Sequence, residues 1–256
     1  MRLLHGPDAV LHATGRDRDL TPEEVLDLYP WPEGQRWVRA MMVTSLDGAA
    51  AGPDGLSGSI SSATDQEVFA AVRRLADAVL VGGGTFRAEG YGPMPAVDDA
   101  HAAGVRRERG KRAAPVLAVV SGTLDLPWDS PTFTDSAERV LVLTGSTADG
   151  DARARAHEHC DLVELDTERV GAGDALDALA DRGLPHVVCE GGPTLLEGLV
   201  REGRLDEADI TVSPTFAGTA QTPRTSGLDE VAGFTLAHVL VGDDGFLVNR
   251  YLRAQA

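Results

Sequence analysis

Short apolar runs alternate with stretches that carry apolar residues at helical spacing through most of the chain. The run at residues 37–43 is the first that is apolar enough for a central strand, and residues 65–76 follow with a helical pattern. The same alternation predicts further strands at 78–81, 116–120, 140–143, 161–165, 186–189 and 208–212, and helices near 147–158, 172–182 and 194–200. Repeated strand–helix units predict an α/β fold in which a mostly parallel sheet lies between two layers of helices.

The last part of the chain changes this pattern. Residues 234–241 and 246–252 are predicted strands, and the turn Gly-Asp-Asp-Gly at 242–245 joins them. Two strands across so short a polar turn are typical of an antiparallel hairpin. The predicted fold is therefore a three-layer α/β fold with a mostly parallel, mixed sheet and a C-terminal antiparallel hairpin.

Two segments fall outside the alternation. Residues 1–35 contain a helix start at Thr21, with proline at the first helical position and acids in the first turn, but too few apolar residues for a core of their own. We therefore expect an N-terminal extension over 1–35 that packs on a main domain over 36–256. Residues 91–114 are rich in proline, alanine and charge without a period, which predicts a solvated excursion or mobile loop.

Two glycine turns each follow a predicted strand and precede a predicted helix. The first is Gly-Gly-Gly-Thr at 82–85, and the second is Gly-Gly-Pro-Thr at 191–194. Glycine lets the backbone approach a ligand closely, and the first amides of a helix lack intrahelical partners and can donate to phosphate. Neither turn fits the dinucleotide fingerprint or the phosphate-loop motif, and a single such turn is more often ordinary loop chemistry. Two of them in one sheet predict a nucleotide that carries two phosphates.

Composition narrows the choice of ligand. The chain has 256 residues and a formal net charge of −17 at pH 7, which works against binding to nucleic acid or anionic membranes, so any anion site must be local. Lys111 is the only lysine among 23 basic residues, so arginine would pair with phosphate.

The two cysteines form no metal or disulfide motif, and the sequence has neither an apolar run of membrane-spanning length nor a signal sequence. These features predict a cytoplasmic protein without a metal site.

A third motif completes a set in fixed order. The turn Thr-Ser-Leu-Asp-Gly at 44–48 comes first, Val-Gly-Gly-Gly-Thr at 81–85 second, and Cys-Glu-Gly-Gly-Pro-Thr-Leu-Leu at 189–196 third. The set resembles the reductase domain of the bacterial riboflavin-biosynthesis proteins, a family with the dihydrofolate reductase-like fold, over roughly residues 36–253. The resemblance implies a homodimer that uses NADPH to reduce a small heterocyclic substrate, a ribosylaminopyrimidinone 5′-phosphate, and opens its ribose to a ribityl chain.

The resemblance also implies which residues contact the ligands. It assigns Ser57, Arg73 and Glu190 to the substrate. It assigns to NADPH the residues Val43, Ser59, Thr85, Glu89, Ser121, Gly191, Gly192, Pro193, Thr194, Leu195 and Leu196. From the residues alone, Glu190 could instead cap the helix that opens at Pro193, and Arg73 could be a surface arginine. The sequence identifies no catalytic residue, because hydride transfer needs positioning and a dry site more than a strong acid.

The chain departs from the family at two positions that commonly carry a cation. Ala49 stands where members have lysine or arginine, and residues 89–93 read Glu-Gly-Tyr-Gly-Pro where members have Asp-Asp-Pro and then arginine; the next arginine here is Arg106. Two charge-assisted substrate contacts of about 1–3 kcal/mol each are thus predicted to be missing.

The zinc motif of the companion deaminase domain is absent from the sequence too. Two other functions stay open: a divergent dihydrofolate reductase-like enzyme and a non-catalytic NADP(H)-binding protein.

Overall fold

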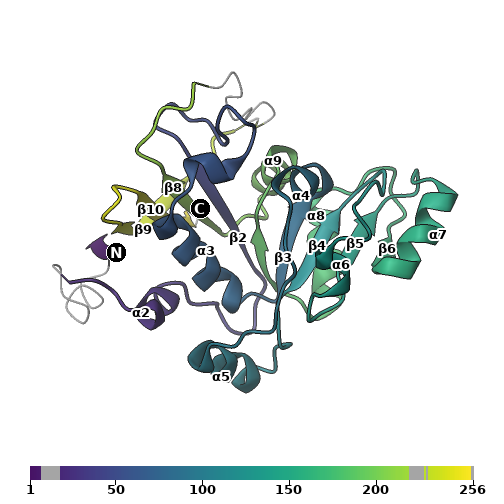
Figure 1. The fold of residues 1–256 in the computed structure, drawn as a ribbon, viewed down its shortest axis with the longest axis horizontal. Coiled ribbons are helices and arrows are strands. Elements are labelled where there is room, and N and C mark those ends of the chain that lie inside the picture. The colour runs from purple at the N-terminus through teal and green to yellow at the C-terminus, as the bar shows by residue number, and fades with distance from the viewer. Residues whose placement is uncertain (7–17, 219–227, 229, 255–256) are drawn as a thin grey trace.

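The computed structural model describes residues 1–6, 18–218, 228 and 230–254, and its strands form one sheet (Figure 1). The strands are β1 (Arg2–His5), β2 (Trp37–Thr44), β3 (Ala78–Gly82), β4 (Val116–Val120), β5 (Leu141–Thr144), β6 (Asp161–Glu164), β7 (His186–Cys189), β8 (Glu207–Val212), β9 (Phe234–Val241) and β10 (Leu247–Arg253). Their order is β1-β9-β10-β8-β2-β7-β3-β4-β5-β6. Neighbours from β8 to β6 run parallel, whereas β8, β10, β9 and β1 run antiparallel to one another. The predicted mixed sheet and its C-terminal hairpin are confirmed.

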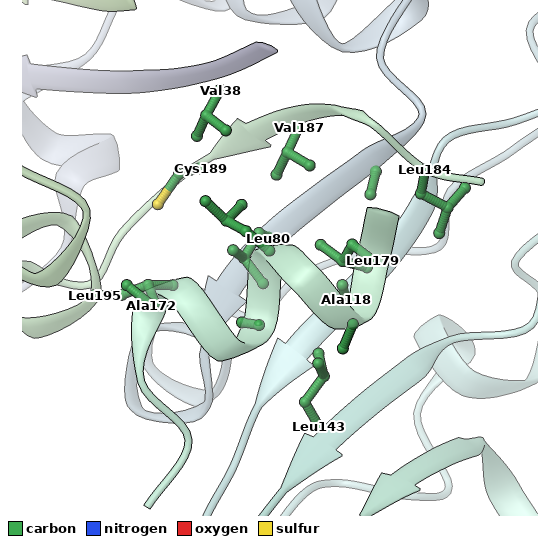
Figure 2. Packing of buried hydrophobic residues seen from close by; sticks show 14 of the residues in the cluster. Val38, Leu80, Ala118, Leu143, Ala172, Leu179, Leu184, Val187, Cys189 and Leu195 are labelled. Carbon is green, nitrogen blue, oxygen red and sulfur yellow. The ribbon is translucent and has the colours of Figure 1, made fainter. Parts of the chain in front are cut away.

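Helices cover both faces of this sheet, because buried side chains along each parallel strand alternate between the two faces. Leu80 faces a core with α8 (Ala172–Ala180) and α9 (Pro193–Arg201), whereas its neighbours Val79 and Val81 face a second core with α4 (Gly83–Glu89) and α7 (Gly150–His159). Figure 2 shows the first core, in which Leu80 of β3 and Val187 of β7 pack near Leu179 of α8. The helices are α2 (Pro22–Asp27), the 3-10 helix η1 (Ser57–Ile60), α3 (Ala63–Arg74), α4 (Gly83–Glu89), α5 (Ala100–Glu108), α6 (Pro131–Thr134), α7 (Gly150–His159), α8 (Ala172–Ala180) and α9 (Pro193–Arg201).

The described part of residues 1–35 packs directly on the sheet. β1 extends the sheet by pairing antiparallel with β9, and α2 begins at Thr21 with a capping box closed by Glu24. Leu3 and Tyr29 are buried in a core shared with α3. A domain boundary at residue 35 stays a prediction, and residues 7–17 lie outside the described part of the chain.

The prediction of a loop over residues 91–114 is wrong in part, because α5 occupies Ala100–Glu108. Asp99 caps this helix by accepting a hydrogen bond from the Ala102 amide at 2.7 Å. Ala102 and Arg106 are its buried residues, so no apolar stripe marks the helix in the sequence. The Arg106 guanidinium donates to the carbonyls of Arg74 and Ala76, just before β3 begins.

A membrane-spanning helix and a cluster of metal-ligating side chains are both absent from the residues that the structure describes. None of the helices there is long and apolar enough to cross a bilayer. No group of three or more His, Cys, Asp or Glu side chains in the same residues could hold a metal ion.

A buried ionic cluster joins β2, β8 and β10. Arg39 Nε lies 2.8 Å from Glu207 Oε1, and Arg250 Nε donates to the same oxygen at 2.7 Å. Asp209 lies two residues along β8 on the same face of the sheet, fully buried, and no described residue donates a hydrogen bond to either of its carboxyl oxygens. Burial and the adjacent Glu207 charge raise the pKa of Asp209 well above its usual range. We therefore expect Asp209 to be protonated at neutral pH.

Replacing Asp209 with asparagine should therefore stabilise the protein increasingly as the pH rises. Folding raises the pKa of this carboxyl, so its contribution to stability is complete below the unfolded pKa, near 4, and is lost as the pH rises toward the folded pKa. The asparagine side chain of the variant cannot ionise, so the variant gains on the parent by up to about 1.4 kcal/mol per pH unit over that window. Urea unfolding at pH 4.5 and pH 8 measures the difference, with the exposed Asp243→Asn as control. An equal loss of stability at both pH values would mean that Asp209 is ionised in the folded protein.

Candidate functional site

The two glycine turns meet at one edge of the sheet, because β7 and β3 are parallel neighbours and their carboxyl ends lie together. The Gly82 amide donates to the Gly191 carbonyl at 2.8 Å, and a Cβ atom added at Gly82 would lie 3.4 Å from the Gly192 nitrogen. Gly191 has a φ of 85°, which side-chain-bearing residues rarely adopt. The two glycine turns are therefore in contact, as the sequence prediction of one shared site requires.

A small cradle lies between the second turn and α4. A Cβ atom at Gly192 would lie 2.5 Å from Thr85 Oγ1, so only glycine fits there without moving Thr85. Gly192 is also the N-cap residue of α9, and no side chain caps that helix end. Pro193 has no N–H and the Leu195 amide donates to the Gly192 carbonyl at 3.0 Å, so the Thr194 amide is the donor in the first turn without a partner among the described residues. This amide and the positive end of the helix dipole lie at the cradle.

A cavity of about 410 Å³ opens beside this cradle, between β2, η1, α3 and α4. Aromatic and thioether side chains supply much of its apolar wall, including Met41, Met42, Phe69 and Tyr91. Seven of the predicted contact residues line the same cavity: Val43, Ser57, Thr85, Glu89, Glu190, Gly192 and Pro193. The structure therefore brings together predicted cofactor and substrate residues that lie up to 150 positions apart in the sequence.

The other predicted contact residues lie outside the cavity lining. Ser59 Oγ donates to Asp54 Oδ1 at 2.9 Å on the exposed side of η1, and Ser121 is buried with its hydroxyl accepting from the Leu124 amide. Leu195 packs in the core. Gly191, Thr194 and Leu196 belong to the second turn and the start of α9, and Arg73 lies behind Glu190.

Arg73 and Glu190 form a bidentate ion pair at the cavity wall. Arg73 Nε and Nη2 lie 2.5 Å from Glu190 Oε1 and Oε2, and the Tyr91 hydroxyl donates to Oε2 at 2.8 Å. The Glu190 side chain is 2% exposed and that of Arg73 is 26% exposed. Burial, followed by the charge of Glu190, raises the pKa of Tyr91, so its hydroxyl stays protonated and donates. The negative charge of the Glu190 carboxylate is thus balanced by Arg73 inside the protein.

Tyr91 belongs to this cluster although the sequence alone does not point to it. Tyr91 follows α4 in the segment assigned to a loop, and its partner Glu190 lies 99 positions away. The only local signal was that a tyrosine occupies the region where the family that the sequence resembles commonly carries arginine. Arg106 does not replace that arginine, because its guanidinium is bound to carbonyls at the amino end of β3, opposite the cavity.

Asp47 has a structural role near the site. Its carboxylate accepts from the Ser45 hydroxyl at 2.5 Å and from the amides of Ala217 and Gly218. These hydrogen bonds, that of Ser45 most of all, lower the pKa of Asp47 to about 2. Asp47 therefore ties the segment after β8 to the turn that ends β2.

A second hollow, of about 480 Å³, lies at the opposite edge of the sheet. Several of its charged side chains pair with one another: Lys111 Nζ lies 2.5 Å from Asp77 Oδ1 and 2.9 Å from His186 Nδ1. Arg109 pairs with Glu33 across the same hollow. Because these charges are satisfied internally, the cavity beside the glycine turns is the better candidate for a ligand site.

Comparison with known families gives one match that covers most of the chain. A family model described as RibD C-terminal domain matches residues 36–248. Among curated proteins, a 2,5-diamino-6-ribosylamino-4(3H)-pyrimidinone 5′-phosphate reductase of Archaeoglobus fulgidus is 27% identical over 187 residues, which cover 73% of this chain and 84% of that protein. The riboflavin biosynthesis protein RibD of Mycobacterium tuberculosis is 30% identical over 175 residues, or 68% of this chain and 41% of RibD. The chain thus spans less than half of the length of the curated RibD proteins that it matches.

Solved structures support the same fold. A pyrimidine reductase-like protein of Corynebacterium diphtheriae superposes with a TM-score of 0.79 at 23% sequence identity, covering 93% of this chain and 100% of that one. A diaminohydroxyphosphoribosylaminopyrimidine deaminase/5-amino-6-(5-phosphoribosylamino)uracil reductase of Thermotoga maritima gives a TM-score of 0.65 at 20% identity, covering 86% of this chain and 57% of that one.

Proposed function

Because the chain belongs to the RibD C-terminal domain family, we propose that it is a reductase that transfers hydride from a nicotinamide cofactor to a ribosylamino-substituted pyrimidine of riboflavin biosynthesis. The observation that carries the proposal is the meeting of the two glycine turns beside a cavity large enough for a heterocycle. In parallel α/β sheets, ligands bind at the carboxyl ends of the strands, where these turns lie.

The residues of the cradle fit a dinucleotide. Gly191, Gly192 and the first turn of α9 would hold the pyrophosphate, since backbone amides can approach it where a Cβ atom would otherwise intrude. Thr85 would add a hydroxyl from α4. When bound, NADPH supplies the hydride. The protein's own contribution is to place the substrate against the nicotinamide and to exclude water from the cavity.

The proposed reaction adds two hydrogens to the substrate. The carbon that joins the ribose to the base nitrogen gains the hydride, its bond to the ring oxygen breaks, and that oxygen gains a proton from solvent. The ribose thereby opens to a ribityl chain, and NADPH becomes NADP⁺. The proposal includes a cytoplasmic location and a homodimer as the working form. Sedimentation of the pure protein would test the homodimer.

We also propose that the cofactor is NADPH and not NADH. The turn after β5 lies on the same edge of the sheet, and Arg153 of α7 donates to the Ser146 carbonyl within that turn. The Arg153 side chain is 27% exposed, and its Nη1 lies 3.4 Å from Glu164 Oε2. We propose that a 2′-phosphate placed at the turn draws Arg153 from this exposed pair. The sequence alone does not point to this arginine, because Arg153 becomes a neighbour of the turn only through the helix that follows it.

Replacing Arg153 with alanine should lower kcat/KM for NADPH by about tenfold and leave kcat/KM for NADH unchanged. A charge-assisted hydrogen bond contributes about 1.5–3 kcal/mol, and partial exposure places this one at the lower end. Steady-state kinetics with both cofactors measure the effect. Arg155→Ala, on the exposed side of the same helix, is the matched control. Equal losses with NADPH and NADH would exclude a 2′-phosphate contact.

A turnover assay tests the function directly. Pure protein is mixed with NADPH and either the 2,5-diamino-6-ribosylaminopyrimidinone 5′-phosphate or its deaminated uracil counterpart, and the absorbance of reduced nicotinamide is followed. We expect oxidation of NADPH and a product heavier by two hydrogens with at least one of these substrates. Oxidation with dihydrofolate alone would instead indicate a dihydrofolate reductase-like enzyme, and NADPH binding without turnover would indicate a non-catalytic binding protein.

A further inference from the structure

Asp65 is a buried carboxylate of the cavity wall that does not cap its own helix. It stands at the third position of α3, lines the cavity and is 7% exposed. In α2 the acid at the same position, Glu24, reaches back to the N-cap amide and closes a capping box. In α3 the cap Ser62 accepts from the Asp65 amide, but the Asp65 carboxylate does not return that bond. Capping of α3 therefore does not occupy the Asp65 carboxylate.

The one side-chain donor to Asp65 among the described residues is Ser61, whose hydroxyl lies 2.7 Å from Oδ2. Oδ1 receives no hydrogen bond from these residues. Asp65 lies in the first turn of α3, where the positive end of the helix dipole attracts hydrogen-bond acceptors. Asp65 thus presents an acceptor to the cavity, and a carboxylate oxygen can take two hydrogen bonds, so Oδ2 can accept a second one.

The other charges on the cavity wall are also acidic. Glu89 accepts from the Ser57 amide at 2.9 Å, and Glu190 is neutralised by Arg73. No Lys or Arg side chain lines the cavity in the part of the chain that the structure describes. A ligand that fills this cavity should therefore turn hydrogen-bond donors, and not acceptors, toward α3.

We propose that Asp65 binds the pyrimidine edge on which a ring N–H lies beside an exocyclic amino group, and that the protein therefore reduces a 2-aminopyrimidinone in preference to a uracil. This inference rests on the proposed reductase function. The N3–H and 2-amino groups of a 2-amino-4(3H)-pyrimidinone are two adjacent donors that match the two oxygens of one carboxylate. In a uracil the 2-amino group is a carbonyl, which would place an acceptor against the Asp65 charge.

The two substrates differ in their place in a reaction sequence. Hydrolysis of the 2-amino group with water gives a carbonyl and releases ammonia, and this converts the aminopyrimidinone into the uracil. A reductase that selects the aminopyrimidinone acts before that deamination. A separate hydrolytic deaminase would then act on the reduced, ribityl product.

The test compares kcat/KM for the two substrates with the intact protein and NADPH. We expect wild type to prefer the 2-amino substrate by about 100-fold or more, since a buried group built to pair with N–H rejects an analogue that lacks it. Asp65→Asn should lower kcat/KM for the 2-amino substrate by about 100-fold and reduce or reverse the preference, because an amide can donate to the uracil carbonyl. NADPH affinity should not change. Glu67→Gln, on the exposed side of α3, is the control.

The outcomes separate this inference from the function on which it rests. Equal turnover of both substrates by wild type, or preference for the uracil, would overturn the role of Asp65 while the reductase function stands. Equal losses for both substrates in Asp65→Asn would also overturn it, since they would indicate a structural role. Failure of both substrates with wild type would refute the reductase function itself. The wild-type comparison requires no variant, so it decides the matter even where Asp65→Asn fails to fold.

Discussion

Replacing Gly192 with valine is expected to weaken NADPH binding by at least about 100-fold in a protein that still folds. A Cβ atom at this position would lie 2.5 Å from Thr85 Oγ1, in the space between the second glycine turn and α4. The two methyl groups of valine would fill the volume that a pyrophosphate needs next to the first amides of α9. Isothermal titration calorimetry with NADPH measures the loss, and circular dichroism reports the fold.

Two further variants show where the effect originates. Gly104→Val, in α5, meets no atom within 4 Å of the added Cβ and serves as the matched glycine-to-valine control. In the double variant Gly192→Ala/Thr85→Ala the hydroxyl that the new Cβ would strike is gone. We expect NADPH binding to stay weak in this double variant, because the methyl group still occupies the cradle. Recovery of wild-type affinity would mean that Gly192 only makes room for Thr85 and does not contact the cofactor.

The elements that could be predicted from the sequence are those marked by a local pattern of apolar residues. Strands such as β3 and β4 are buried on both faces, so they appear as short continuous apolar runs between helical stretches. α5 was missed because it buries only Ala102 and Arg106, and Arg106 is buried for the carbonyls that it binds. No periodicity of apolar residues can report a helix held in this way.

The site was predictable to the extent that backbone chemistry defines it. The glycine turns were visible in the sequence, because few other structural roles require such residues between a strand and a helix. The order of the parallel strands brings the two turns together. Tyr91 was not predictable, because its role depends on a contact with Glu190 across 99 positions. Asp65 carried a local signal, an acid in the first turn of a helix, but capping explains that signal equally well until the side chain is located.

Breaking the Arg73–Glu190 pair is expected to destabilise the fold more than any other single change at the site. The resemblance assigned Arg73 to the substrate, whereas the structure gives both its Nε and Nη2 to Glu190. Removing one member of a buried ion pair leaves the other charge uncompensated, at a cost of about 3–5 kcal/mol. Because the Glu190 side chain is 2% exposed, Arg73→Ala should fall in this range.

A double-mutant cycle measures this coupling. Arg73→Ala/Glu190→Gln removes both charges, so we expect it to recover about 2 kcal/mol or more of the stability lost in Arg73→Ala. Arg73→Lys keeps the charge but not the bidentate geometry and should lie between the parent and Arg73→Ala. Urea unfolding gives the free energies, and Arg74→Ala, on the same helix, should stay within about 0.5 kcal/mol of the parent. If Arg73→Ala instead keeps its stability and raises only the KM of a phosphorylated substrate, Arg73 binds the substrate phosphate and its pairing with Glu190 contributes little to the fold.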